Sequence, residues 1–471
     1  MISLTLLAVL LHFVIVFTGL ACIQLASPYK RINLIKNTPF GWGIGVVFLY
    51  LLSNFFVRNE ILLTSWHFLT FALMLIVITT GLWFHFKAPI IRNAKTPIRL
   101  NALDICILIF IAIKVSTITY IAFVNPIIDA DAVSDQGYIP LAKAVAQGLP
   151  YSEILRTRIS ELHSAVSPTL LTAWSTMFFD RWHISFVALP WLFSYFSIIG
   201  LAFLAPFKIT RNVTASLICS YIFSSVYLLI IHTIRPGYHD AFVTFYFIMM
   251  ISITTVFTLQ NTKCDTYCFT LILGAFIGLF LSKIGGKLFS VLFCLYWLNY
   301  YLCHYRKIRF YTLLKIESEI LFVLVTSIIL LNQNIIAPYF SHHGIVNIFA
   351  TLTPRMPHPR SFQQFSLHLF KWFSFGILWW LTLVLYFLNL LKKKTNGEKA
   401  LLLLVSIVFL SVLYVCNFTV LAYSEDATTT GRFYLQIIGL LIPCFCIFIR
   451  DSSVCPVIDS KTSLESKSQS Q

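Results

Sequence analysis

The sequence predicts an all-α polytopic membrane protein, and three observations support that prediction. Of the 471 residues, 58% are hydrophobic and only 11% are charged, whereas a soluble domain carries about 25% charged residues. The mean hydropathy is +0.83. Apolar runs approaching or exceeding the roughly 20 residues needed to cross a bilayer recur along the chain. This composition excludes a soluble enzyme, a nucleic-acid-binding protein and a disordered chain.

The apolar runs predict a bundle of about 12–13 transmembrane helices. Segments 267–282 and 286–303 are so close together that they form either a hairpin or a broken helix. Segment 168–179 is too short to span and predicts an interfacial or re-entrant helix. The candidate spans are 2–26, 40–57, 66–86, 103–124, 183–205, 213–232, 240–259, 267–282, 286–303, 319–337, 367–391, 400–422 and 433–449.

The basic residues predict the orientation of this bundle. The net charge is +16, and 21 of the 34 Lys and Arg residues follow every second span, beginning with the first. By the positive-inside rule, this side is cytoplasmic. Residues 1–449 then form the bundle and its loops, with the N-terminus outside. The Ser-rich segment 450–471 is predicted to be a disordered cytoplasmic tail.

The first long outer loop, 125–182, carries an acidic motif. Asp129 and Asp131 stand just beyond the fourth span, where a carboxylate can act as a general base or hold a divalent cation. The alternative is that they cap the amphipathic helix predicted at 138–147. Further along the loop, His163 is either a ligand for phosphate or sugar hydroxyls or an interfacial anchor.

Two short outer loops carry charges close to the membrane. Arg235, His239 and Asp240 lie within six residues between two spans. Charged groups at this depth usually face a cavity or each other, and the alternative is an Arg235–Asp240 ion pair that closes the turn. Lys283 and Lys287 flank Ile-Gly-Gly, which predicts a phosphate site, unless the two lysines are snorkelling anchors.

The second long outer loop, 338–366, is rich in His, Arg and Pro and resembles a mobile cationic lid that includes Arg355. Its histidines are too irregularly spaced to predict a metal site. Before the last span, Arg432 and Tyr434 stand in a Gly-Arg-Phe-Tyr sequence. Arg432 is placed to hold a phosphate, or to pair with one of the two acidic residues that precede it.

These features resemble the C-type glycosyltransferases, multi-spanning enzymes that use lipid-phosphate sugars. The similarity rests on many spans, the Asp129-Ala-Asp131 motif, the His/Pro segment that starts at His163, and the Gly-Arg-aromatic-Tyr sequence ending at Tyr434. Within that class the chain is similar to bacterial protein mannosyltransferases, lipid-A aminoarabinose transferases and O-antigen-modifying glucosyltransferases. Many of these relatives have Asp-Glu where this chain has Asp-Ala-Asp.

The resemblance implies an inverting transfer of a sugar from polyprenyl phosphate to a hydroxyl of a cell-envelope glycan, lipid or protein. The site would face the outside of a bacterial inner membrane, without a nucleic-acid partner. Asp129 or Asp131 would take the acceptor's proton, and Asp240 or His239 would orient the acceptor or the base. The phosphate leaving group needs positive charge, for which the candidates are Arg235, Lys283, Lys287, Arg355 and Arg432.

Two other classes of function remain open. A lipid-linked glycan polymerase or ligase shares the span count and the substrate type, and the cationic second loop favours it. A transporter or flippase would require ionisable residues near mid-membrane. Lys114 is the clearest of these, while Asp104 and Lys371 stand near span ends.

Overall fold

The computed structural model describes residues 2–26, 32–58, 65–85, 100–124, 166–179, 182–261, 266–305, 372–418 and 427–452, with five further positions between 139 and 147. Every regular element in these ranges is helical, which confirms the all-α prediction. The helices are α1 (Ile2–Ala26), α2 (Leu34–Arg58), α3 (Ser65–His85), α4 (Ala102–Val124), α8 (Val166–Trp174), α9 (Ile184–Val187), α10 (Leu189–Thr210), α11 (Val213–Ser224), α12 (Tyr227–Ile234), α13 (Asp240–Gln260), α14 (Thr266–Ser282), α15 (Ile284–Tyr305), α19 (Trp372–Phe375), α20 (Leu378–Leu390), α21 (Asn396–Phe418), α22 (Ala427–Gln436), η4 (Ile438–Leu440) and α23 (Leu441–Ser452).

These helices overlap twelve of the thirteen predicted spans, and segment 319–337 lies outside the described residues. Within the described part, five helices are long and apolar enough to cross a membrane, or six if α11 and α12 form one bent span. The five are Leu4–Ala26, Ala102–Val124, Ile184–Thr210, Asp240–Gln260 and Asn396–Asn417.

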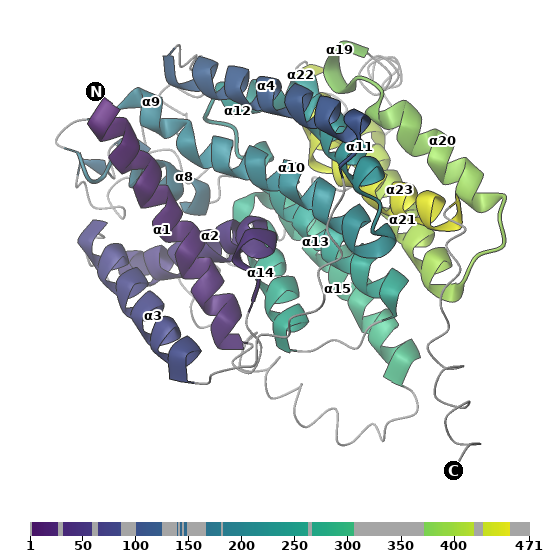
Figure 1. Cartoon of the computed structure of the whole chain (residues 1–471), viewed down its shortest axis with the longest axis horizontal. Helices are drawn as coiled ribbons and strands as arrows, with labels where there is room; N and C mark the ends of the chain where they lie inside the picture. The colour runs from purple at the N-terminus through teal and green to yellow at the C-terminus, as the bar shows by residue number, and fades with distance from the viewer. Residues whose placement is uncertain are drawn as a thin grey trace.

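Helix α13 is the centre of the bundle, and Figure 1 shows it behind α10 with the other helices around it. In its most apolar window 94% of the residues are buried inside the protein, against 11% for α4, which lies at the edge. Large apolar side chains such as Phe110 and Ile113 are exposed on α4. An apolar outer surface of this kind is what a helix needs where it faces lipid.

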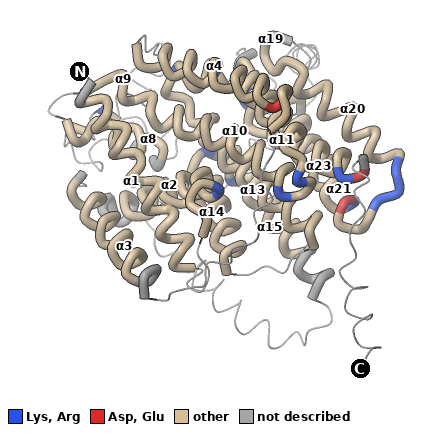
Figure 2. Tube along the Cα trace, viewed as in Figure 1, with Lys and Arg blue, Asp and Glu red and all other residues tan. Residues whose placement is uncertain are grey.

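Polar contacts join several helix ends at one end of the bundle. Tyr267 donates a hydrogen bond to Asn37 Oδ1 across 2.5 Å, and Gln260 donates one to the Lys208 carbonyl across 2.8 Å. Arg450 donates to the Leu259 carbonyl at the same end. These residues border the loops that the sequence assigns to the cytoplasm. Figure 2 shows how sparse the charges are, with a blue run of lysines between α20 and α21.

A lysine lies at each of two breaks between helices. The run at 213–232 breaks between α11 and α12, which meet at 59°. Lys114 of α4 donates to the Ser225 hydroxyl at this break, and its ammonium lies 4.3 Å from the centre of the Tyr221 ring. These contacts give Lys114 a packing role at the break. The second break is at Lys283, the single residue between α14 and α15, where the sequence predicts a hairpin or a broken helix.

Helices α1 and α2 pack closely through glycines. A Cβ atom added to Gly19 would lie 1.9 Å from the Gly41 carbonyl oxygen, and one added to Gly45 would lie 1.9 Å from the Ile15 carbonyl oxygen. Small residues let membrane helices approach until their backbones touch. The N-terminal segment is therefore an integral part of the bundle.

Candidate functional site

The loop between α12 and α13 is held in one conformation by a glycine and a tryptophan. Gly237 has a φ of 135°, a backbone conformation that residues with a Cβ atom rarely adopt. The indole N–H of Trp191 donates to the Tyr238 carbonyl across 3.1 Å. The loop therefore presents Tyr238, His239 and Asp240 at a fixed position at the end of the bundle that the sequence assigns to the outside.

Asp240 is the first residue of α13, and its side chain is wholly buried. Lys283 Nζ donates to both of its carboxylate oxygens across 3.0 Å. Gln436 Nε2, at the end of α22, donates to Oδ1 across 2.5 Å. One carboxylate thus ties together α13, the junction of α14 and α15, and α22.

An arginine and a histidine also lie around this ion pair. The Arg432 guanidinium stacks over the Tyr238 ring at 4.9 Å, and the His232 ring lies 5.2 Å from the same ring. Both His232 and Arg432 act electrostatically on Asp240. We call Asp240, Lys283, Gln436, Arg432, His232 and Tyr238 the Asp240 cluster.

His239 is buried beside this cluster and is neutral. Burial lowers the pKa of His239 to about 3, and the nearby positive charge of Lys283 acts in the same direction. A neutral imidazole can orient a hydroxyl group or a carboxylic acid but supplies no charge to a phosphate. The sequence prediction that His239 orients the acceptor or the base is compatible with that state.

The ion pair that the sequence offered as an alternative, Arg235 with Asp240, does not form in the described part of the chain. Asp240 pairs with Lys283 instead. Arg235 ends α12, and its Nε makes no hydrogen bond to the described residues. Although Arg235 is close in sequence, the turn at Gly237 separates the two residues, and the lysine comes from a different helix junction.

The Ile-Gly-Gly sequence forms the start of α15. Gly285 and Gly286 lie in the first turn of α15, where a Cβ atom would come within 2.6 Å of Gln436 Oε1 and 2.0 Å of the Leu279 carbonyl oxygen, respectively. The glycines therefore permit close packing at the bend. Lys287 turns back over the Phe280 ring, at 5.4 Å from its centre.

The remaining predicted site residues divide into two groups. Tyr434 is described and is completely buried, with its ring 6.1 Å from that of Trp379. It packs in the core, and its predicted contact with substrate stays a prediction. Asp129, Asp131, His163 and Arg355 lie outside the described residues, as do most of the loop at 125–182, all of the loop at 338–366 and nearly all of the tail.

Sequence reasoning missed Gln436 and His232. Both are polar residues at the ends of apolar runs, and buried polar side chains in such runs usually bind each other or a ligand. That signal was available for both positions. Within the described residues, no group of three His, Cys, Asp or Glu side chains is close enough to hold a metal ion.

A scan against protein-family models and searches of curated proteins and of solved structures found no match to this chain.

Proposed function

We propose that the chain is a membrane glycosyltransferase that takes its sugar from a polyprenyl-phosphate donor, and that the Asp240 cluster binds the donor's phosphate. The observation that carries the proposal is the charge balance of the cluster. Lys283 and Arg432 lie close to a single described carboxylate, which leaves a net positive charge at the membrane boundary.

Lys283 is the group best placed to contact an anion. Its side chain is 25% exposed, whereas Asp240 is not exposed at all. A lysine ammonium has three hydrogens, and two of them are directed at the two oxygens of Asp240. The third hydrogen is available for a phosphate oxygen that approaches from the exposed side.

Positive charge is what departure of a lipid phosphate requires. As the glycosidic bond breaks, negative charge develops on the phosphate, and fixed cations in a site of low dielectric stabilise it more than water does. Arg432 adds a planar donor that matches phosphate oxygens. In this proposal Asp240 is a positioning residue that holds Lys283, and Asp129 or Asp131 remains the predicted base.

The test is sugar transfer by the purified full-length protein in liposomes that contain a radiolabelled polyprenyl-phosphate sugar and candidate acceptors. Arg432→Gln is expected to lower transfer by about 100-fold or more, the size of effect seen when one donor to a developing charge is removed. Asp129→Asn and Asp131→Asn are assayed in parallel, and one of them should lose activity.

Lys393→Gln is the matched control, because Lys393 is an exposed cation at the opposite end of the bundle. It should transfer at the unmodified rate. Full activity of Arg432→Gln at normal membrane levels would remove the cluster from the mechanism. Absence of transfer by the folded, unmodified protein from every polyprenyl-phosphate sugar offered would contradict the proposed reaction.

A further inference from the structure

A second group of cations lies at the other end of the bundle, where α2, α10, α13 and α14 meet. The Lys36 ammonium and the Arg211 guanidinium lie 5.9 Å and 5.8 Å from the centre of the Phe207 ring. The Lys208 ammonium lies 5.7 Å from the centre of the Phe40 ring. Three positive charges thus surround two phenylalanine rings.

None of these three cations forms an ion pair with a carboxylate in the described part of the chain. Asp104, at the same end of the bundle, accepts hydrogen bonds from the Thr214 hydroxyl and the Asn101 backbone N–H. Like charges brought together without a counter-ion repel one another. An anion at this site would remove that cost.

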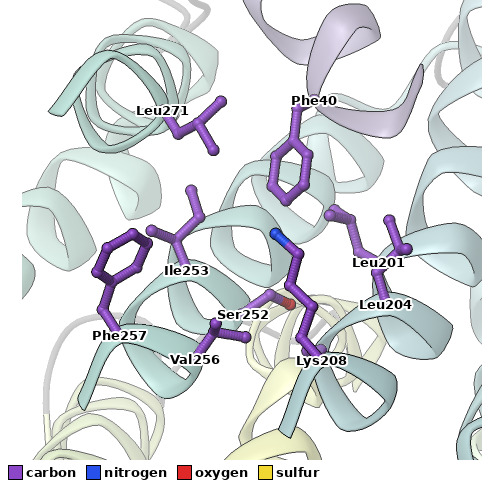
Figure 3. Close-up of a pocket in the computed structure, with 10 residues that line it drawn as sticks. Phe40, Leu201, Leu204, Lys208, Ser252, Ile253, Val256, Phe257 and Leu271 are labelled. Carbon is purple, nitrogen blue, oxygen red and sulfur yellow. The ribbon is translucent and has the colours of Figure 1, made fainter. Parts of the chain in front are cut away.

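The Lys208 side chain extends inward from the end of α10. Figure 3 shows its ammonium among Phe40, Leu201 and Ile253, in a cavity lined mostly by apolar side chains. The cavity has a volume of about 20 Å³, room for about one water-sized group. A lysine at a helix end usually extends towards water, whereas the Lys208 ammonium turns inward and faces the Phe40 ring, which offers it no acceptor oxygen.

A second polar group, the Ser252 hydroxyl, lines the same cavity. Ser252 of α13 is 2% exposed, and its hydroxyl makes no hydrogen bond to the described residues. Buried polar groups are nearly always hydrogen-bonded. An ammonium and a hydroxyl directed at one small space are both satisfied by one oxygen atom of a bound group.

We propose that Lys36, Lys208 and Arg211 bind the phosphate headgroup of an anionic phospholipid, with an oxygen atom of the headgroup region between Lys208 and Ser252. The surroundings favour a lipid as the source of the anion. Leu34 and Ile35, which immediately precede Lys36, are 52% and 87% exposed, so the cations adjoin an apolar surface suited to acyl chains. Basic pockets between membrane helices are typical sites for anionic lipid headgroups. The site is separate from the Asp240 cluster and does not rest on the proposed activity.

The test compares the full chain in phosphatidylcholine nanodiscs with and without phosphatidylglycerol, by unfolding temperature and by native mass spectrometry of the retained lipid. The unmodified protein should be stabilised and should retain phosphatidylglycerol. Arg211→Gln should weaken that retention about fivefold, which corresponds to about 1 kcal/mol for one cation near the surface. Lys393→Gln, which removes an exposed lysine at the same end, should behave as the unmodified protein.

The variant Lys208→Met separates a loss of lipid binding from a folding defect. Methionine keeps most of the length of the side chain and removes the half-buried charge. This variant should therefore be at least as stable as the unmodified protein in phosphatidylcholine and should gain nothing from phosphatidylglycerol. An equal gain in Lys208→Met and the unmodified protein would overturn the proposal. Stabilisation by inorganic phosphate in phosphatidylcholine, equal to that by phosphatidylglycerol, would also overturn it in favour of a free anion.

Discussion

Lys283→Met is expected to lower the free energy of unfolding by about 3–5 kcal/mol, the cost of breaking a buried ion pair by removing one partner. Among the described residues, the substitution leaves the wholly buried Asp240 carboxylate with Gln436 as its remaining side-chain hydrogen-bond donor. The measurement is unfolding of the purified protein in mixed detergent micelles, followed by tryptophan fluorescence. The binding of a phosphate does not enter this measurement, so it tests the structure of the cluster apart from its function.

The double variant, Asp240→Asn with Lys283→Met, should recover most of the lost stability. Asparagine keeps the shape of aspartate, carries no charge, and still accepts a hydrogen bond from Gln436. Asp240→Asn alone should cost less than Lys283→Met, because the lysine is 25% exposed and can turn towards water. An ordinary surface substitution changes the free energy of unfolding by at most about 0.5 kcal/mol. If the change for Lys283→Met is that small, Lys283 and Asp240 do not form a buried ion pair.

Several members of the site could be predicted from the sequence because charge near a membrane is informative. Asp240, Lys283 and Arg432 each stand at the end of an apolar run, where a charged group usually faces a cavity or another charge. Their mutual contact could not be predicted, because Asp240 lies 43 positions from Lys283 and 196 from Gln436. Arg235 is close in sequence, which made it the obvious partner, but proximity in sequence does not fix side-chain direction across a turn.

The positions of the helices could be predicted from the sequence, but the breaks within the apolar runs could not. Hydropathy detects an apolar run whether or not the helix is continuous, so the break between α11 and α12 is invisible in the run at 213–232. Its stabilising partners, Lys114 and Tyr195, come from two other helices. Tyr195 donates to the Ser224 carbonyl across 2.9 Å, which satisfies a backbone group at the break.

Gly45→Ala is the second substitution with a large expected effect. The added Cβ atom would lie 1.9 Å from the Ile15 carbonyl oxygen, and because this obstacle is backbone, α1 and α2 must move apart. Overpacking of this kind costs about 1–3 kcal/mol, and occasionally more. The free energy of unfolding, measured as above, should fall by at least that amount.

Gly81→Ala in α3 is the matched control, because a Cβ atom there would meet nothing within 4 Å. In a helix interior alanine is favoured over glycine by about 0.5–1 kcal/mol, so this variant should be neutral or more stable. The two substitutions add the same methyl group to helical glycines and should change stability in opposite directions. If both stabilise the protein, α1 and α2 are not in backbone contact at Gly45; if both destabilise it, α3 is packed where the structure leaves it open.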